Sequence, residues 1–449
     1  MASTLDSATS HSRAPSRRAV DLSRDLARGA VSAREIAEAC LSRIEAQEPA
    51  IRAWAHLDPN AVREQAEAAD RRRRDGQALS PLDGIPIGIK DNIDTGDAPT
   101  EMGSPIHAGR RPEQDALIVR HLRSLGMVIL GKTVTTPFGM NAPAPTRNPL
   151  YPGHTLGASS VGSAAAVAAG MVPLTINTQN TSSTTRPASY AGVPAYKPSH
   201  GLIALDGCLA ISPPVTHLAF IANALEDLAL LADHAITTND HHVFGPPNDE
   251  RGFLASCRAQ SEAPLRVAFV KGPWWHLADS AADQALTQFA ERLGIAETLN
   301  LPRTFERALQ AHADIVAGDM AVTLEAEYAD FKAQLPEEAV TYIEKGHALT
   351  AADYARALRL RAALYGGLLA AMEGYDAIIT LSTPGAPPRL EVGIGEGAFS
   401  MPWTFLGLPT LSLPLLADPN GLPIGLQVIA RRNDDHRLFA AGSRLAAGT

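Results

Sequence analysis

The segment over residues 157–187 constrains the fold of this chain most, because it combines small residues, a short apolar stretch and a polar run. Residues 162–169 are nearly all small, which is typical of a helix that other backbone approaches closely, and Gly170 is placed as its C-terminal cap. A strand is predicted over residues 172–178. Nine consecutive polar residues, 177–185, come at the end of that strand.

The polar run either forms an exposed loop or lines a buried site in which each hydroxyl has a partner. The small-residue helix that precedes the run favours the buried site. Helix, strand and loop would then bring Ser159 or Ser160 near Ser182 or Ser183. Two serines at such a crossing suggest that a hydroxyl acts as a nucleophile.

A short apolar strand within residues 82–92 ends on Lys90, and a lysine at the end of a buried strand needs a physical reason. One interpretation is that the ammonium snorkels to the surface or forms an ion pair with Asp91 or Asp94. The other is that burial lowers the lysine pKa from about 10.4 toward 7, so that the neutral amine serves as a base. A serine nucleophile would need such a base, because the sequence has no G-x-S-x-G elbow, no H-E-x-x-H motif and no cysteine in a cysteine-protease setting.

Helical and strand patterns alternate along the chain, which predicts an α/β fold: one α/β/α layered domain with a central twisted mixed sheet covered by helices. Residues 1–17 are expected to be a disordered tail and residues 18–449 the domain. Residues 237–252 form the clearest break in composition and are expected to be a surface loop or insertion. Residues 281–374 are mainly helical in pattern, and form either a substrate cap or one helical layer.

Local patterns place the individual elements. Ser32 with Glu35 three residues later predicts a capping box at a helix start. Apolar periodicity then gives the remaining elements. Helices are expected over residues 19–28, 32–46, 60–73, 116–125 and 218–232, and strands over residues 127–130, 265–270 and 377–381.

Composition excludes several classes of function. The 39 basic and 48 acidic residues give a net charge of −9, which disfavours a nucleic-acid surface, and no apolar run approaches the ~20 residues of a membrane span. Residues 126–133 match the letters of a phosphate-binding P-loop, but their apolar centre is interpreted as a buried strand. Three distant cysteines offer neither a disulfide framework nor a zinc site, so no metal or cofactor and a cytoplasmic location are expected.

The residues around the serines resemble the amidase signature family, whose hydrolases use a Ser-cis-Ser-Lys triad. The family pattern G-G-S-S-G-G-S-A-A-A is similar to residues 157–166, which read G-A-S-S-V-G-S-A-A-A. The family pattern G-T-x-x-G-G-S-x-x-R-P-A is similar to residues 177–188, which read N-T-Q-N-T-S-S-T-T-R-P-A. The resemblance extends over residues 26–428 and implies the amidase signature fold.

The resemblance implies a role for each matching position. Ser183 would be the nucleophile, Ser159 the bridging serine after a cis peptide bond from Ala158, and Lys90 the base. The implied activity is hydrolysis of the C–N bond of a small linear amide or carbamate (urethane), with esters as a further class, by a monomer or homodimer without nucleic-acid or membrane partners. The residues expected to bind the oxyanion are Asn180, Thr181 and Ser182, and those expected to support the site are Gln179, Arg186 and Ser160.

This chain departs from the family at five glycines. Glycine is needed only where φ is positive or where another group packs against the backbone. Either the oxyanion loop has ordinary dihedrals and adds side-chain donors, or the activity has been retuned or lost. A catalytically silent binding or scaffold protein therefore stays open, as does the amidase subunit of a tRNA-dependent amidotransferase, which would need partner subunits. The replacing residues are Ala158, Val161, Asn177, Thr181 and Ser182.

Overall fold

The structure is a computed structural model, and it describes residues 17–236, 252–259 and 264–448. The predicted disordered tail, apart from Arg17, and the predicted surface loop, apart from Gly252, lie outside these residues. Within them, one hydrophobic core contains buried side chains from Ala19 near the start to Leu445 near the end. No helix of the described ranges is both long and apolar enough to cross a bilayer.

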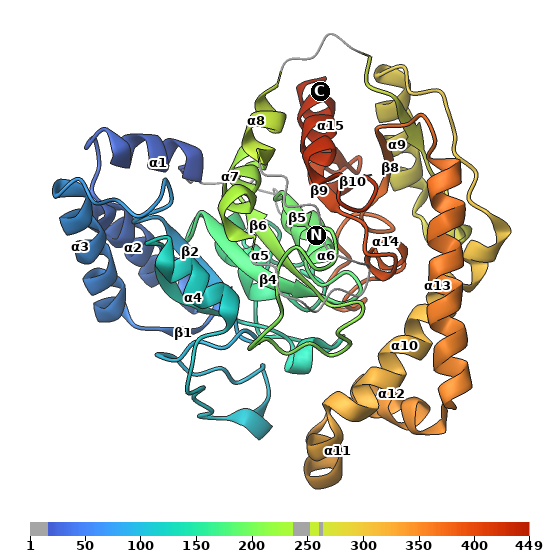
Figure 1. Cartoon of the computed structure of the whole chain (residues 1–449), viewed down its shortest axis with the longest axis horizontal. Coiled ribbons are helices and arrows are strands. Elements are labelled where there is room, and N and C mark those ends of the chain that lie inside the picture. The colour runs from blue at the N-terminus through green and yellow to red at the C-terminus, as the bar shows by residue number, and fades with distance from the viewer. Residues whose placement is uncertain (1–16, 237–251, 260–263, 449) are drawn as a thin grey trace, which may run out of the picture.

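A single mixed sheet runs through the molecule (Figure 1), in the order β1-β3-β2-β4-β6-β5-β9-β10-β8-β7. Strands β2, β3 and β4 pair in parallel, as do β7 and β8, and the other pairs are antiparallel. The predicted mixed sheet is thus confirmed. The strands are β1 (Trp54–Leu57), β2 (Pro86–Lys90), β3 (Val128–Thr133), β4 (Leu174–Gln179), β5 (Ala195–Lys197), β6 (His217–Ala222), β7 (Val267–Phe269), β8 (Ala377–Leu381), β9 (Thr410–Ala417) and β10 (Pro423–Ile429).

Helices cover the sheet in two groups, with α5 packed on α6 and α7 packed on α8 and α15. The predicted α/β/α layering is therefore confirmed. The α-helices of the described ranges are α1 (Ala19–Ala27), α2 (Ala33–Ile51), α3 (Pro59–Arg74), α4 (Leu117–Ser124), α5 (Val161–Ala168), α6 (Thr185–Ala191), α7 (Leu225–Ala235), α8 (Phe253–Arg258), α9 (Ser280–Arg292), α10 (Ala308–Thr323), α11 (Glu325–Phe331), α12 (Glu337–Ala348), α13 (Ala351–Ala371), α14 (Met401–Phe405) and α15 (Asp435–Ala447).

The sequence patterns near α2, α5 and β3 predicted local structure correctly. The capping box of Ser32 and Glu35 opens α2. A Cβ on Gly162 of α5 would clash with the backbone of Ala53 and Val134, so this helix is narrow because other backbone lies against it. The supposed P-loop is β3, whose six residues are buried.

The predicted helix over residues 218–232 is wrong in its first half. Residues His217–Ala222 form β6, which pairs with β4 and β5, and the helix α7 begins only at Leu225. A fully apolar run fits a buried strand and a buried helix equally well by periodicity. The tertiary position between two strands decides in favour of the strand.

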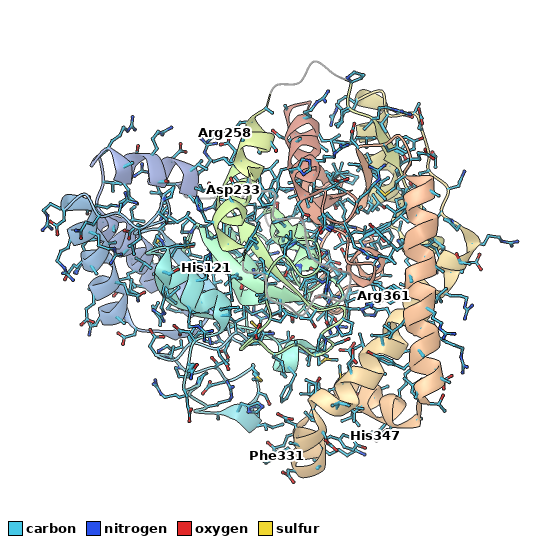
Figure 2. The ribbon with its side chains drawn as sticks, in the orientation of Figure 1. His121, Asp233, Arg258, Phe331, His347 and Arg361 are labelled. Atoms are coloured by element: carbon cyan, nitrogen blue, oxygen red, sulfur yellow. The ribbon has the colours of Figure 1, made fainter. Side chains whose placement is uncertain are left out.

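Most of residues 281–374 are helical. Helices α10 to α13 of this segment lie beside the sheet in one part of the molecule, and α11 forms the end of this part (Figure 1). Phe331 and His347 mark that end, whereas Arg361 on α13 lies toward the body of the molecule (Figure 2). Arg361 Nη1 donates a hydrogen bond of 3.0 Å to the Pro214 carbonyl, which ties this segment to the loop before β6.

Candidate active site

Three parts of the chain converge where β2 and β4 end. Ile89 pairs with Ile176 in parallel, so Lys90 at the end of β2 lies near the polar loop that follows β4. Ser159 precedes α5, and the Ser160 N–H donates 3.1 Å to the Ser183 carbonyl, which joins the two serine-bearing segments. Ser159 and Ser183 line one cavity of about 390 Å³. The expected crossing of helix, strand and loop is therefore present.

Lys90 is completely buried and has no carboxylate partner among the described residues. Its Nζ donates 2.7 Å to Ser159 Oγ and 3.5 Å to the Thr178 carbonyl. Loss of hydration on burial lowers the pKa of Lys90 to about 7. Near neutral pH a large part of the Lys90 population is therefore uncharged, and it faces a serine hydroxyl.

The ion-pair interpretation of Lys90 is wrong for both aspartates. Asp91 lies 3.4 Å from the buried Lys132 Nζ, and Asp94 forms a bidentate pair with Arg110 at 2.7 and 3.0 Å. Each carboxylate thus has its own cation. Although Asp91 and Asp94 are close to Lys90 in sequence, their carboxylates bond other cations in space.

The Ala158–Ser159 peptide bond is cis, as the resemblance implied. Its surroundings are polar: the Ala158 carbonyl accepts 3.0 Å from Arg186 Nη2, and the Ser159 carbonyl accepts 3.3 Å from the Thr136 N–H. No hydrogen bond joins the Ser159 and Ser183 hydroxyls within the described residues. Catalytic hydrogen bonds of this kind are often long without substrate and tighten when it binds.

The polar loop presents three backbone N–H groups at the cavity. Thr181, Ser182 and Ser183 line the cavity, and their N–H groups donate to no acceptor in the part of the chain that the structure describes. Free N–H groups beside a nucleophile are the usual donors to an oxyanion. Asn180, also expected to bind the oxyanion, lines the cavity as well; its N–H likewise donates to no acceptor in the described residues, and its carbonyl is hydrogen-bonded to His312 Nε2 at 3.0 Å.

Gln179, Arg186 and Ser160 hold this loop in different ways. Gln179 Oε1 accepts 2.9 Å from the N–H of Thr184, the N-cap of α6, and 3.0 Å from the N–H of Thr185, its first residue. Arg186 uses its guanidinium on the Gly395 carbonyl (2.8 Å), Asn141 Oδ1 (2.6 Å) and the Ala158 carbonyl. Ser160 acts through its N–H, since its buried Oγ has no partner in the described residues.

The replaced glycines do not require glycine in this structure. None of Ala158, Val161, Asn177, Thr181 and Ser182 has a positive φ. The loop therefore has dihedrals that ordinary residues adopt, as the dihedral part of the first alternative expected. Two of the added side chains, those of Thr181 and Ser182, pack against a glycine elsewhere in the chain, Gly397.

Replacing Gly397 by alanine is expected to destabilise the fold by about 1–3 kcal/mol, because the new Cβ would lie 2.7 Å from Ser182 Oγ and 3.3 Å from Thr181 Cγ2. Urea unfolding measures the loss. Adding Ser182→Gly should recover part of it as a coupling between the two sites. Gly153→Ala is the control, since its Cβ would meet open space. Strictly additive effects at Ser182 and Gly397 would contradict the packing described.

Several cavity residues were missed by sequence reasoning. Within the helical segment no motif marked them, because a residue that faces a cavity and one that faces the core follow the same helical period. For these residues, the sequence offered one indication: residues 281–374 were expected to form either a substrate cap or a helical layer. No group of three His, Cys, Asp or Glu side chains within residues 17–236, 252–259 and 264–448 is arranged to hold a metal ion. His312, which bonds the Asn180 carbonyl from outside the cavity, was missed as well. The missed cavity residues include Asn92, Asn141, Thr216, Val316, Met320, Glu338, Tyr342 and Glu396.

Comparison with known proteins finds relatives of this chain in sequence and in fold. The profile of the family described as Amidase matches residues 35–439. A glutamyl-tRNA(Gln) amidotransferase subunit of Chloroflexus aggregans is 32% identical over 93% of both chains. The solved peptide amidase of Stenotrophomonas maltophilia superimposes with a TM-score of 0.85 at 26% identity, covering 96% of each chain. Another solved chain superimposes with a TM-score of 0.89 at 28% identity, covering 96% of this chain and 98% of that one. It comes from a vestigial protein complex that is described as revealing the evolutionary origins of an s-triazine catabolic enzyme.

Proposed function

The chain belongs to the amidase family, and we propose that it is a serine hydrolase that cleaves the C–N bond of a small amide or carbamate through an acyl-enzyme on Ser183. Esters are a further substrate class of the same chemistry. The observation that carries the proposal is the buried Lys90, whose Nζ lies 2.7 Å from Ser159 Oγ beside the cavity that contains Ser183. A buried lysine without a carboxylate partner has the properties of a base.

In the proposed reaction, neutral Lys90 accepts the Ser159 proton while Ser159 accepts the Ser183 proton. Ser183 Oγ attacks the carbonyl carbon, and the oxyanion is held by free N–H groups of the polar loop. The C–N bond then breaks, and the leaving nitrogen takes the proton back through Ser159. Water, deprotonated by the same relay, attacks the acyl-enzyme and releases the acid with Ser183 restored.

The cavity favours a neutral apolar acyl group. Its wall contains apolar side chains, and its charged residues are two carboxylates, Glu338 and Glu396, and one cation, Arg186. Arg186 is 3% exposed and is bonded to three neutral oxygens. Because both Nη groups of Arg186 are already bonded to protein oxygens, a substrate carboxylate would gain no direct hydrogen bond from them and would meet two carboxylates, at a cost in free energy. The apolar residues are Phe138, Met140, Leu209, Ile211, Val316, Met320, Ile394 and Met401.

This charge pattern supports a free-standing hydrolase, rather than the amidase component of an amidotransferase, as the function of this chain. Hexanamide and adipic acid monoamide are a matched pair that differs by a terminal carboxylate. We expect kcat/KM for ammonia release to be at least about tenfold higher for hexanamide, which corresponds to about 1.4 kcal/mol. Glutamine, which carries an α-ammonium as well as an α-carboxylate, is assayed separately as the substrate of the amidotransferase alternative.

The carboxylates of the cavity wall provide the control. Glu396→Gln should reduce the difference in kcat/KM between hexanamide and adipic acid monoamide. The substitution removes one charge that repels the monoamide carboxylate and keeps the shape of the side chain. Preference of the wild type for glutamine or the monoamide would favour the amidotransferase component. No release of ammonia, amine or acid from amides, carbamates or esters would favour the catalytically silent protein.

A further inference from the structure

Three consecutive carbonyl groups of the polar loop are each held by a donor from outside the loop. The Asn180 carbonyl accepts 3.0 Å from His312 Nε2 of α10, and the Thr181 carbonyl accepts 2.8 Å from Thr404 Oγ1 of α14. The Ser182 carbonyl accepts 2.9 Å from the Arg186 N–H of α6. The loop is thus held residue by residue by three separate helices.

The direction of each carbonyl fixes the direction of the next N–H. In a trans peptide the C=O of one residue and the N–H of the following residue point to opposite sides of the chain. Holding the Asn180 carbonyl on His312 therefore turns the Thr181 N–H away from α10. That N–H has no acceptor in the described residues, and Thr181 lines the cavity, so His312 determines where an oxyanion donor points.

We propose that His312 is a positioning residue for the oxyanion loop, acting through the Asn180 carbonyl; the inference rests on the function proposed above. His312 touches neither the substrate cavity nor the two serines. It supplies a single N–H that holds one peptide group in the orientation that the oxyanion needs. Oxyanion donors contribute to catalysis because their orientation is fixed before the charge develops.

The His312 side chain is suited to this task by its surroundings. It is 1% exposed, and burial lowers its pKa to about 4, so the ring is neutral at physiological pH. A neutral ring has one N–H, and the contact with a carbonyl places it on Nε2. Nδ1, which then lacks a hydrogen, has no partner in the described residues.

The same face of α10 meets both the loop and the substrate cavity. His312, Val316 and Met320 are spaced four residues apart and therefore lie on one face of the helix. Val316 and Met320 line the cavity, whereas His312 holds the loop. A second contact fixes Asn180, because Thr216 Oγ1 donates 2.6 Å to its Oδ1. A substrate seated against α10 would thus rest on the element that orients the Thr181 N–H.

A purely structural role for His312 would be packing. Its ring meets Phe405 edge to face, with centroids 5.9 Å apart. If His312 contributed only packing, any replacement of similar size would change the stability of the fold. It would not change how much more tightly the enzyme binds the transition state than the substrate, so kcat would be unaffected. The two roles therefore differ in kinetics rather than in stability.

The test compares His312→Gln with His312→Met. Gln places an N–H where His Nε2 lies, Met fills similar volume without a donor, and both lose the ring contact with Phe405. We expect His312→Met to lower kcat about 10- to 100-fold with KM changed less than about threefold, and His312→Gln to stay within about fivefold of the wild type. A boronic acid analogue of the best substrate should bind to His312→Met more weakly by the factor lost in kcat/KM.

Each outcome decides the inference. Equal kcat for the two variants, or a loss confined to KM or to thermal stability, would overturn the role of His312 while an active wild type leaves the proposed hydrolase intact. A wild type that neither turns over any amide, carbamate or ester nor binds the boronic acid would overturn the hydrolase itself, and the positioning role with it. Circular dichroism checks that both variants are folded. If His312→Met is unfolded, His312→Asn replaces it, because the shorter asparagine side chain cannot reach Asn180, and the same losses in kcat and in inhibitor binding are expected.

Discussion

Ser183→Ala is expected to lower kcat by roughly 10⁴–10⁶-fold, because it removes the atom that forms the acyl-enzyme. The fold should be unaffected, since the change deletes one hydroxyl from a side chain that is 8% exposed and leaves almost no cavity. Turnover is measured as ammonia release and stability as the thermal midpoint. A fluorophosphonate should add to the wild type at the peptide that contains Ser183, and should not add to the variant.

Ser182→Ala is the matched control, because it deletes a neighbouring hydroxyl from the same loop. Its Oγ is buried and has no partner among the described residues, so its loss should leave labelling intact and turnover within about tenfold. Labelling at Ser159 or Ser160 in the wild type would show that the nucleophile was assigned to the wrong serine. Full turnover by Ser183→Ala would end the acyl-enzyme mechanism.

Lys90→Met is expected to lower kcat by about 10²–10⁴-fold without loss of stability. Methionine keeps the apolar stem and removes the amine that faces Ser159. In the wild type, kcat/KM should rise with pH along an ionisation near 7, because the pKa of Lys90 is lowered to about 7 and the base acts when neutral. The variant should lack this dependence. A variant that keeps most of the wild-type turnover would end the Ser-Ser-Lys hypothesis.

The effect of Lys90 on stability has the opposite sign from its effect on catalysis. Its pKa falls from 10.5 to about 7 on folding, a difference that corresponds to roughly 5 kcal/mol. The unfolded chain binds the proton more tightly, so this cost is fully present below about pH 7 and is lost as the pH rises to 10.5. Lys90→Met should therefore match or exceed the wild type in stability at pH 7, and its advantage should shrink toward pH 10.

Lys197 offers the control for this comparison. It is equally buried, and burial likewise lowers its pKa to about 7, but its Nζ donates 3.2 Å to the Pro198 carbonyl and also bonds the Leu408 carbonyl. Lys197→Met should leave the pH dependence of kcat/KM unchanged, because Lys197 neither bonds Ser159 nor lines the cavity, and its stability relative to the wild type should vary with pH in the same direction as that of Lys90→Met. Equal kinetic losses in the Lys90 and Lys197 variants would mean that burial alone, and not contact with Ser159, explains the effect.

Residue patterns along the chain were sufficient to predict most local features and several of the residues that the structure brings together at one cavity. The capping box of α2, the narrow helix α5 and the strand that ends on Lys90 follow from neighbouring residues, because caps, close backbone approach and strand burial leave short-range patterns. The family motifs placed Ser159 and Ser183 at positions that the structure brings to one cavity. The order of the motifs along the chain was enough to predict a layered α/β fold.

Which groups meet in space depended on the tertiary structure. His217–Ala222 is a strand because β4 and β5 lie on either side of it, and Asp91 pairs with Lys132 rather than Lys90 because β3 runs beside β2. The partner of the Asn180 carbonyl, His312, is 132 residues away in sequence. Such contacts leave no local pattern, since hydrogen bonds and charges depend on distance in space, and distance between remote segments is fixed only when the whole core packs.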